Sequence, residues 1–108
     1  MLKTSKEFKT TENIVHAIHR MRLFKSPGEI ELIKESIAIT AKAHYSAMRT
    51  KKTGKNEIEL QARIEYEFKK NAAYSDAYTS IVACGNSANT LHYIENNKPL
   101  VGGELILI

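Results

Sequence analysis

The stretch that decides the fold of this chain is Tyr78-Thr-Ser-Ile-Val-Ala-Cys-Gly-Asn-Ser-Ala-Asn-Thr-Leu-His-Tyr93. Its β-branched segment, residues 79–84, predicts a strand, and the small and polar residues 85–89 predict the turn that follows. Residues 91–93 look like a brief extended return. A second apolar strand is expected over residues 104–108, after a glycine pair that favours a turn.

Three helices are expected ahead of these strands. Residues 11–21 carry apolar side chains at helical spacing, which predicts a short amphipathic helix. Ser26 and Glu29 have the capping-box pattern, with a proline at the first helical position, so a second helix should begin there and run to about Arg49. Residues 56–71 repeat that pattern and predict a third helix. Helices followed by strands indicate the α+β class.

Each of the two longer helices should bury one apolar face. In the second helix this face is expected to consist of Ile30, Ile33, Ile37, Ala41, His44 or Tyr45, and Met48. In the third helix the apolar residues that recur every four positions are Leu60, Ile64 and Phe68. Because a short loop joins them, the two helices should pack as a hairpin or cross at an angle.

The last strand, Leu105-Ile-Leu-Ile108, is apolar on both faces, which is typical of a strand inside a sheet. Such a strand needs neighbours on its open edge, since otherwise it becomes a template for aggregation. We therefore expect the chain to be part of a larger domain or an obligate partner of another chain. Self-association through the open sheet edge is also expected.

Composition limits the classes of function. The 108 residues are 43% apolar and 26% charged, as in ordinary globular proteins. The chain has no apolar run long enough to span a membrane and no secretory signal pattern at its start. Cys84 is the only cysteine, which fits a reducing, cytoplasmic setting. The net charge is +4, but the basic cluster at residues 51–55 lacks interleaved aromatics, so we expect neither nucleic acid nor membrane as a partner.

His92 is the best candidate for a working residue, because it follows a turn of small and polar residues and can titrate near neutral pH. The alternative is a histidine that only hydrogen-bonds the backbone. His16 and His19 lie three residues apart, but they belong to no recognised metal-binding motif. Cys84 is more typical of a small apolar core residue than of a nucleophile. These patterns indicate one histidine and an unfinished sheet, and they specify no reaction.

A family resemblance covers residues 20–108. It is carried, in order along the chain, by Arg22-Leu-Phe-Lys-Ser-Pro-Gly-Glu-Ile-Glu-Leu-Ile-Lys34, Gly54-Lys-Asn-Glu-Ile-Glu-Leu60, residues 78–85, residues 89–93 and Gly102-Gly-Glu-Leu-Ile-Leu-Ile108. This succession resembles the first portion of the catalytic domain of Xaa-Pro aminopeptidases and prolidases, the creatinase-like metallopeptidases. The resemblance implies a partial pita-bread fold, with three helices packed on an incomplete antiparallel sheet. It assigns residues 1–21 to a linker and short helix, and residues 22–108 to a truncated catalytic domain.

The resemblance also implies a chemistry. In the family, two divalent metal ions, often manganese, activate a water and polarise the scissile carbonyl. His92 matches the family's histidine beside the metals, which contacts the substrate and moves protons or stabilises the intermediate. Tyr78 and Ile81 match the segment near the substrate pocket. The family's five metal ligands (two aspartates, a histidine and two glutamates) correspond to positions after Ile108. We therefore expect no metal ligand, no cofactor and no peptidase activity in this chain alone.

Three functional hypotheses follow. The leading one is a fragment of a metal-dependent aminopeptidase that removes the N-terminal residue from Xaa-Pro peptides. The alternative is a non-catalytic, peptidase-like module that binds a protein or peptide at its open sheet edge. A small basic nucleic-acid binder ranks last, because it rests on net charge alone.

Overall fold

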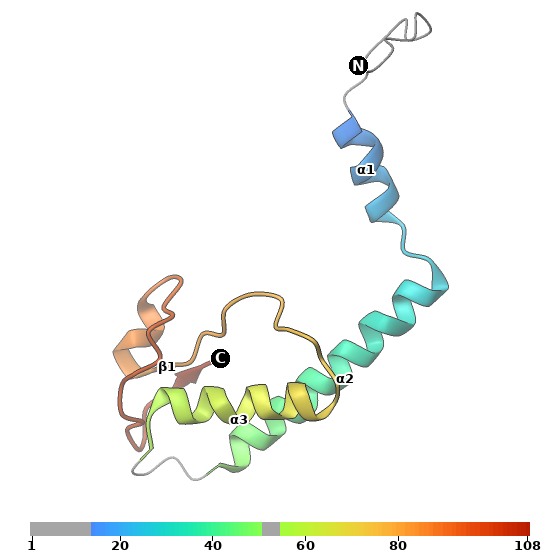
Figure 1. Ribbon diagram of the computed structural model, residues 1–108. Helices are drawn as coiled ribbons and strands as arrows, with labels where there is room; N and C mark the ends of the chain where they lie inside the picture. Colours follow the sequence, from blue (N-terminus) through green and yellow to red (C-terminus); the bar gives the residue numbers. More distant parts are fainter. Residues whose placement is uncertain (1–13, 51–54) are drawn as a thin grey trace, which may run out of the picture. The chain divides into compact units, whose positions relative to one another are not determined.

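The computed structural model describes residues 14–50 and 55–108. The chain divides into two units, Met1–Ile33 and Lys34–Ile108, and each is described by itself. The elements, in chain order, are α1 (Ile14–Leu23), α2 (Pro27–Arg49), α3 (Glu57–Lys70), β1 (Ala83–Cys84), the 3-10 helix η1 (Gly85–Asn89) and β2 (Ile106–Leu107) (Figure 1). Helices thus precede a small antiparallel sheet, which confirms the α+β class. None of the described helices is long and apolar enough to cross a membrane.

The first unit contains α1 and the start of α2. The helix predicted over residues 11–21 ends later, at Leu23, and its first three residues lie outside the described part of the chain. No residue of α1 is buried. At the start of α2, the Ser26 N–H donates to the Glu29 carboxylate (2.7 Å), and the Glu29 N–H donates to the Ser26 hydroxyl (3.3 Å). The predicted capping box is therefore confirmed.

The face that α2 buries differs from the predicted one. Its buried residues are Ala43 and Ala47, whereas Ile37 and Met48 of the predicted face are exposed. The two alanines lie one turn apart in the cluster that contains the buried residues of α3. Small side chains at these positions allow α3 to approach closely. The sequence periodicity selected a face of mostly large apolar residues, whereas the residues that α2 buries are two alanines.

The third helix begins where the sequence predicts. The Asn56 side chain caps it by accepting the Glu59 N–H (2.9 Å), while the Glu59 carboxylate bonds Lys55 Nζ (2.8 Å). Its predicted apolar face is confirmed, with two buried members and one partly buried: Leu60, Ile64 and Phe68. Asn56 and Pro99 also form an isolated antiparallel bridge, which ties the start of α3 to a segment far along the chain.

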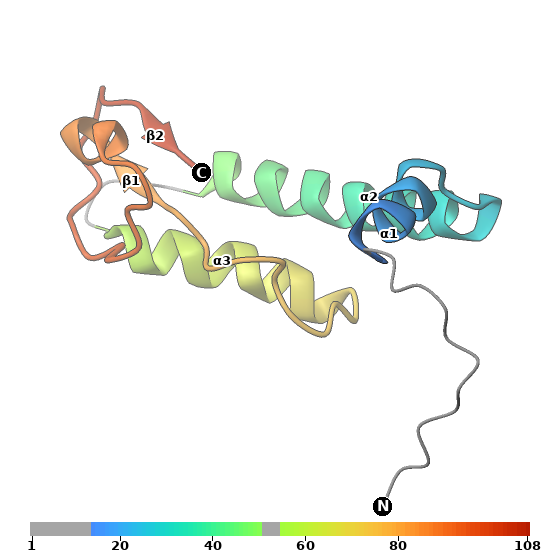
Figure 2. The same cartoon turned by 90° about the horizontal axis from the view of Figure 1, so that it is seen from above.

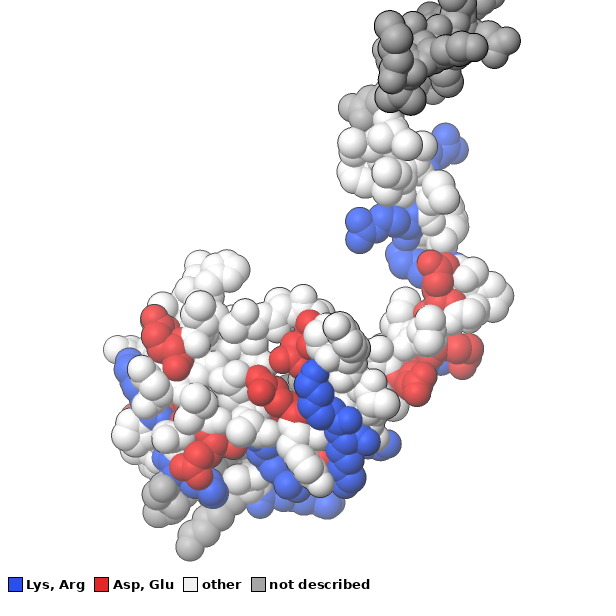
Figure 3. Space-filling view, viewed as in Figure 1, with Lys and Arg blue, Asp and Glu red and all other residues white. Residues whose placement is uncertain are grey.

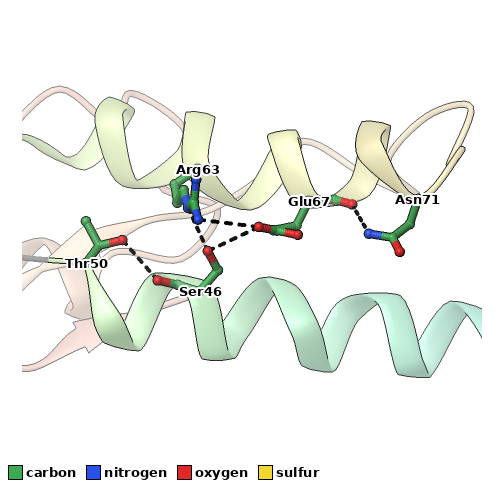
Figure 4. Close-up of polar contacts among 5 residues, drawn as sticks. All are labelled: Ser46, Thr50, Arg63, Glu67 and Asn71. Atoms are coloured by element: carbon green, nitrogen blue, oxygen red, sulfur yellow. Dashed lines mark hydrogen bonds and ion pairs between the residues drawn. The ribbon is translucent and has the colours of Figure 1, made fainter.

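Polar contacts join α3 to the C-terminal half of α2, and the two helices run side by side there (Figure 1 and Figure 2). The Ser46 hydroxyl accepts from Arg63 Nε (2.6 Å) and donates to the Glu67 carboxylate (3.4 Å), while Arg63 and Glu67 form an ion pair (3.5 Å) (Figure 4). Two side-chain-to-carbonyl bonds, from Thr50 to Ser46 (3.0 Å) and from Asn71 to Glu67 (2.7 Å), flank this contact. The expected packing of the two long helices is confirmed.

The sheet has two strands, paired antiparallel with Ala83 opposite Leu107 and Cys84 opposite Ile106. Both strands are shorter than predicted, since the sequence indicated residues 79–84 and 104–108. A cluster of buried residues from α2, α3, β1 and the later loop forms the core: Ala43, Ala47, Leu60, Ile64, Val82, Cys84 and Leu100. Cys84 is thus a core residue, as predicted.

Candidate functional site

His92 lies in the loop that joins η1 to the segment before β2, and it is exposed. Its backbone φ is +54°, in the left-handed region. For a residue with a Cβ this conformation costs of the order of 1–3 kcal/mol, and it persists only where the surroundings hold it. The chain therefore turns at His92, and the predicted extended return over residues 91–93 is wrong.

A buried carboxylate holds the residues around this loop. Glu57, in the first turn of α3, is fully buried and accepts three hydrogen bonds. They come from the Cys84 N–H (2.8 Å), the Lys98 N–H (2.9 Å) and the Tyr93 hydroxyl (2.6 Å). The Glu57 N–H also donates to the Lys98 carbonyl (2.9 Å). Buried carboxylates are tolerated only when they are paired or hydrogen-bonded in this way.

These hydrogen bonds determine the charge states of Glu57 and Tyr93. Burial by itself raises the pKa of Glu57, but the bonds from Tyr93, Cys84 and Lys98 outweigh burial, so its pKa lies below the usual range. The same Tyr93–Glu57 bond, together with burial, raises the pKa of Tyr93 above its usual value. Near neutral pH the site therefore holds an ionised Glu57 and a neutral Tyr93.

Asn96 is the second buried polar residue that holds this region. Its side-chain oxygen accepts the Val82 N–H (2.9 Å), and its side-chain nitrogen donates to the Ser80 carbonyl (2.8 Å) and to Gln61 (2.7 Å). Asn96 also has a positive φ, +44°, which asparagine tolerates better than most residues. It therefore connects α3, the segment before β1 and the loop after His92.

Tyr78 and Ile81, the residues predicted to contact substrate, both line one cavity of about 330 Å³. Tyr78 is largely exposed, and Ile81 is half-buried. The cavity is also lined by residues of α2, α3 and β2, among them His44, Phe68 and Leu107. His92 is not one of its lining residues. The structure thus brings together two of the three predicted site residues and places the third in a separate loop.

The family resemblance implies two metal ions, which would need a group of ligating side chains. In the described part of the chain, no group of three or more histidine, cysteine, aspartate or glutamate side chains is placed to hold a metal ion. Glu57, the most buried carboxylate, has its oxygens occupied by three donors. The described residues therefore do not fit a two-metal centre, and we assign no chemical step of this chain to a metal.

Charged side chains on the visible face do not separate by sign. Figure 3 shows acidic and basic side chains next to one another over residues 34–108. Lys55 pairs with Glu59, and Arg63 pairs with Glu67. Most of the basic cluster at residues 51–55 lies outside the described residues. The basic side chains seen here are those of ordinary solvated helix surfaces.

Comparisons with known proteins identify the family. The sequence profile of metallopeptidase family M24 matches residues 31–108. This chain belongs to metallopeptidase family M24. It is 44% identical over 91 residues to the Xaa-Pro aminopeptidase of Haemophilus influenzae, covering 84% of this chain and 21% of that protein. It is 41% identical over 91 residues to human Xaa-Pro aminopeptidase 3, covering 84% of this chain and 18% of that protein.

Solved structures of M24 relatives agree with the fold. Zinc-substituted Escherichia coli aminopeptidase P in complex with product matches with a TM-score of 0.84 and 38% identity, covering 88% of this chain and 22% of that chain. Aminopeptidase PepP of Pseudomonas aeruginosa matches with a TM-score of 0.82 and 42% identity, covering 85% of this chain and 21% of that chain. These likenesses confirm the family resemblance and the partial pita-bread fold. The M24 chain spans about a fifth of the length of these relatives.

Sequence reasoning missed the residues that organise this part of the M24 domain. Glu57 follows the Asn56 cap, so it reads as an ordinary first-turn acid that interacts with the helix dipole. Asn96 lies in a polar run that reads as loop. The only available signal is that Glu57 lies within the family motif at residues 54–60 and that Asn96 follows the one at residues 89–93, and that signal does not indicate burial.

Proposed function

We propose that this chain is the first portion of the catalytic domain of a metal-dependent aminopeptidase that removes the N-terminal residue from Xaa-Pro peptides. The observation that carries the proposal is the agreement with E. coli aminopeptidase P, with a TM-score of 0.84 over 88% of this chain. The relatives from Haemophilus influenzae and human bear the same activity in their names. Within this proposal, residues 22–108 form the domain portion and residues 1–21 a linker and short helix.

Each predicted site residue has a role in this proposal. His92 donates a hydrogen bond to the developing oxyanion or relays a proton, and its imidazole is exposed and so accessible to a substrate. Tyr78 and Ile81 contact the substrate, and the cavity that they share supports this role. Its lining combines apolar and aromatic side chains with several polar ones, as small-ligand sites do.

The complete domain would bind two divalent metal ions, for which we propose manganese, through residues outside this chain. When bound, such ions supply Lewis-acid activation of water and of the scissile carbonyl. The chain alone is therefore expected to be inactive. Incubation with Mn²⁺ and an Xaa-Pro dipeptide should give no turnover, and robust turnover that a chelator abolishes would contradict this expectation. We also propose a reducing, cytoplasmic setting, because Cys84 is a single, buried free thiol.

A chimera tests the proposed activity directly. Residues 31–108 would replace the matching segment of E. coli aminopeptidase P, and hydrolysis of an Xaa-Pro peptide would be measured. We expect an active chimera in which His92→Ala lowers kcat by about 100-fold or more, the usual range for a lost proton-transfer group. Leu91→Ala is the matched control, since Leu91 is the exposed neighbour. A folded, metal-loaded chimera without Xaa-Pro hydrolysis would contradict the activity, and an unaffected His92→Ala variant would contradict the role of His92.

The second candidate function is a non-catalytic module that binds a strand at its open sheet edge. The observation that favours it is the exposure of β2 and its surroundings: Leu105 is 86% exposed, and Leu107 and Ile108 are 46% and 43% exposed. Self-association through this edge is part of the same proposal. Size-exclusion chromatography with light scattering distinguishes the outcomes. A dimer or oligomer is expected, and a stable monomer with an ordered terminal strand would contradict self-association.

A further inference from the structure

Both ends of the segment that carries His92, residues 84–98, bind the side chain of Glu57. The backbone N–H of Cys84, at the start of this loop, and that of Lys98, at its end, donate to Glu57 at 2.8 and 2.9 Å. The two ends use different oxygens of the same carboxylate. Because a carboxylate is planar and rigid, this arrangement fixes the separation of the two ends of the loop.

A third bond reaches the residue next to His92. The Tyr93 hydroxyl donates to Glu57 (2.6 Å), and Tyr93 is buried while His92 is exposed. His92 immediately precedes Tyr93 in the chain, and its backbone φ of +54° is left-handed. A buried, bonded Tyr93 therefore restricts the conformations that His92 can adopt. The strained turn at His92 needs such a restraint, because an unrestrained histidine returns to an ordinary φ.

We propose that Glu57 is a positioning residue for His92, which holds the His92 backbone in its left-handed turn through Tyr93 and the two ends of the loop. This inference rests on the proposed function, because it assumes that the placement of His92 matters for catalysis. It also specifies the chemistry required at position 57. Three donors converge on two oxygens, so a carboxylate serves all three, whereas a carboxamide presents an N–H₂ group to at least one of them.

Nuclear magnetic resonance of the whole 108-residue chain tests this inference without any activity measurement. The Cα and Cβ shifts of His92 report its left-handed backbone, and amide exchange at Cys84 and Lys98 reports the two ends of the loop. In Glu57→Gln we expect His92 to lose the left-handed shift pattern and both amides to exchange faster. In Tyr93→Phe, which removes only one hydroxyl, we expect the His92 shifts to move in the same direction by a smaller amount.

Glu59→Gln is the matched control, because it makes the same chemical change two residues away on an exposed carboxylate. It should leave the His92 shifts unchanged. If Glu57→Gln fails to fold, Tyr93→Phe decides the question. Faster exchange at Cys84 and Lys98 with an unchanged His92 pattern would make Glu57 merely structural and overturn the inference, as would equal changes in Glu59→Gln.

The proposed function and this inference fail in different ways. An active chimera with an unaffected His92→Ala variant would remove the catalytic role of His92 but leave the backbone measurement as it stands. In the chimera, a positioning role for Glu57 should lower kcat more than it raises KM, since His92 would act on the reacting group rather than on substrate binding. A Glu57→Gln chimera whose kcat is unchanged while His92→Ala is inactive would overturn the inference alone.

Discussion

The two edges of β1 are completed in different ways. On one edge, β1 pairs with β2, and the Gly85 N–H donates to the Leu105 carbonyl (2.9 Å). On the other edge, the N–H groups of Val82 and Cys84 donate to the side chains of Asn96 and Glu57 (2.9 and 2.8 Å). Alternate residues of a strand direct their N–H groups to opposite edges, so these side-chain oxygens occupy the place of a neighbouring strand.

This difference suits the two edges to different roles. The edge completed by side chains is buried, and its bonds hold a loop rather than another strand. The edge completed by β2 ends at exposed apolar residues, of which Leu105 is 86% exposed. The buried polar edge holds the backbone in a fixed geometry, whereas the exposed apolar edge leaves a surface on which another strand can pair.

The largest expected effect comes from breaking the buried edge. Glu57→Gln should lower the free energy of unfolding by about 3–5 kcal/mol, because two buried donors and one partly buried donor lose a charged acceptor. Urea denaturation followed by circular dichroism measures the change. Glu59→Gln, whose carboxylate is exposed and bonds Lys55, should change it by less than about 0.5 kcal/mol. Equal effects of the two substitutions would show that the buried edge contributes nothing special.

Lowering the pH should also reduce the free energy of unfolding through Glu57, but by a smaller amount than the Glu57→Gln substitution. The folded-state pKa of Glu57 is lowered, because the bonds from Tyr93, Cys84 and Lys98 outweigh burial. Its contribution to stability is therefore present above the unfolded pKa and lost as pH falls through the folded pKa. Denaturation measured from about pH 7 to pH 3 should show this loss, and Glu57→Gln should remove most of it. If the free energy of unfolding fell equally steeply with decreasing pH in the unsubstituted chain and in Glu57→Gln, this assignment would be contradicted.

Two other carboxylates also contribute to the loss of stability in acid. The pKa of Glu29 is lowered by its bonds to Ser26, and the pKa of Glu59 by its bond to Lys55, so some loss of stability at low pH should persist in Glu57→Gln. At alkaline pH the dependence of stability on pH has the opposite direction, because Tyr93 loses a proton there. The raised pKa of Tyr93 means that its contribution is present below the unfolded pKa and lost as pH rises through the folded pKa.

Local chemistry was readable from the sequence, and long-range contacts were not. The caps at Ser26 and Asn56 were predicted, because each cap is completed within three residues. The role of Glu57 depends on partners 27 to 41 residues later, so no pattern within α3 indicates its burial. The buried face of α2 was missed for the same reason, since Ala43 is selected by the approach of α3 and not by its own hydrophobicity. The motif around His92 predicted a site residue there, but it did not indicate the left-handed turn of its backbone.

A substitution at Gly85, directly after β1, should have an intermediate effect on the free energy of unfolding. Gly85 follows β1 with φ +56°, and a Cβ there would overlap the Glu104 carboxylate. Gly85→Ala should therefore lower the free energy of unfolding by about 1–2 kcal/mol, since alanine disfavours a positive φ and Glu104 must move. Gly102→Ala is the control, because a Cβ at Gly102 meets no atom within 4 Å. Thermal unfolding compares the two variants, and a neutral Gly85→Ala would show that the turn after β1 tolerates a side chain.

The smallest effect on stability, and a separate effect on assembly, is expected at the exposed edge. Leu105→Glu should change the free energy of unfolding by less than about 0.5 kcal/mol, because Leu105 is already 86% exposed. The same charge should shift the chain toward monomer if β2 associates with a second copy, since like charges would meet across a symmetric edge. Light scattering at several protein concentrations measures this shift. Leu91→Glu, at a residue 89% exposed in the loop next to His92, is the matched control. A change in mass with Leu91→Glu but not with Leu105→Glu would move the association surface from β2 to the loop, and would reverse the roles assigned to the two edges.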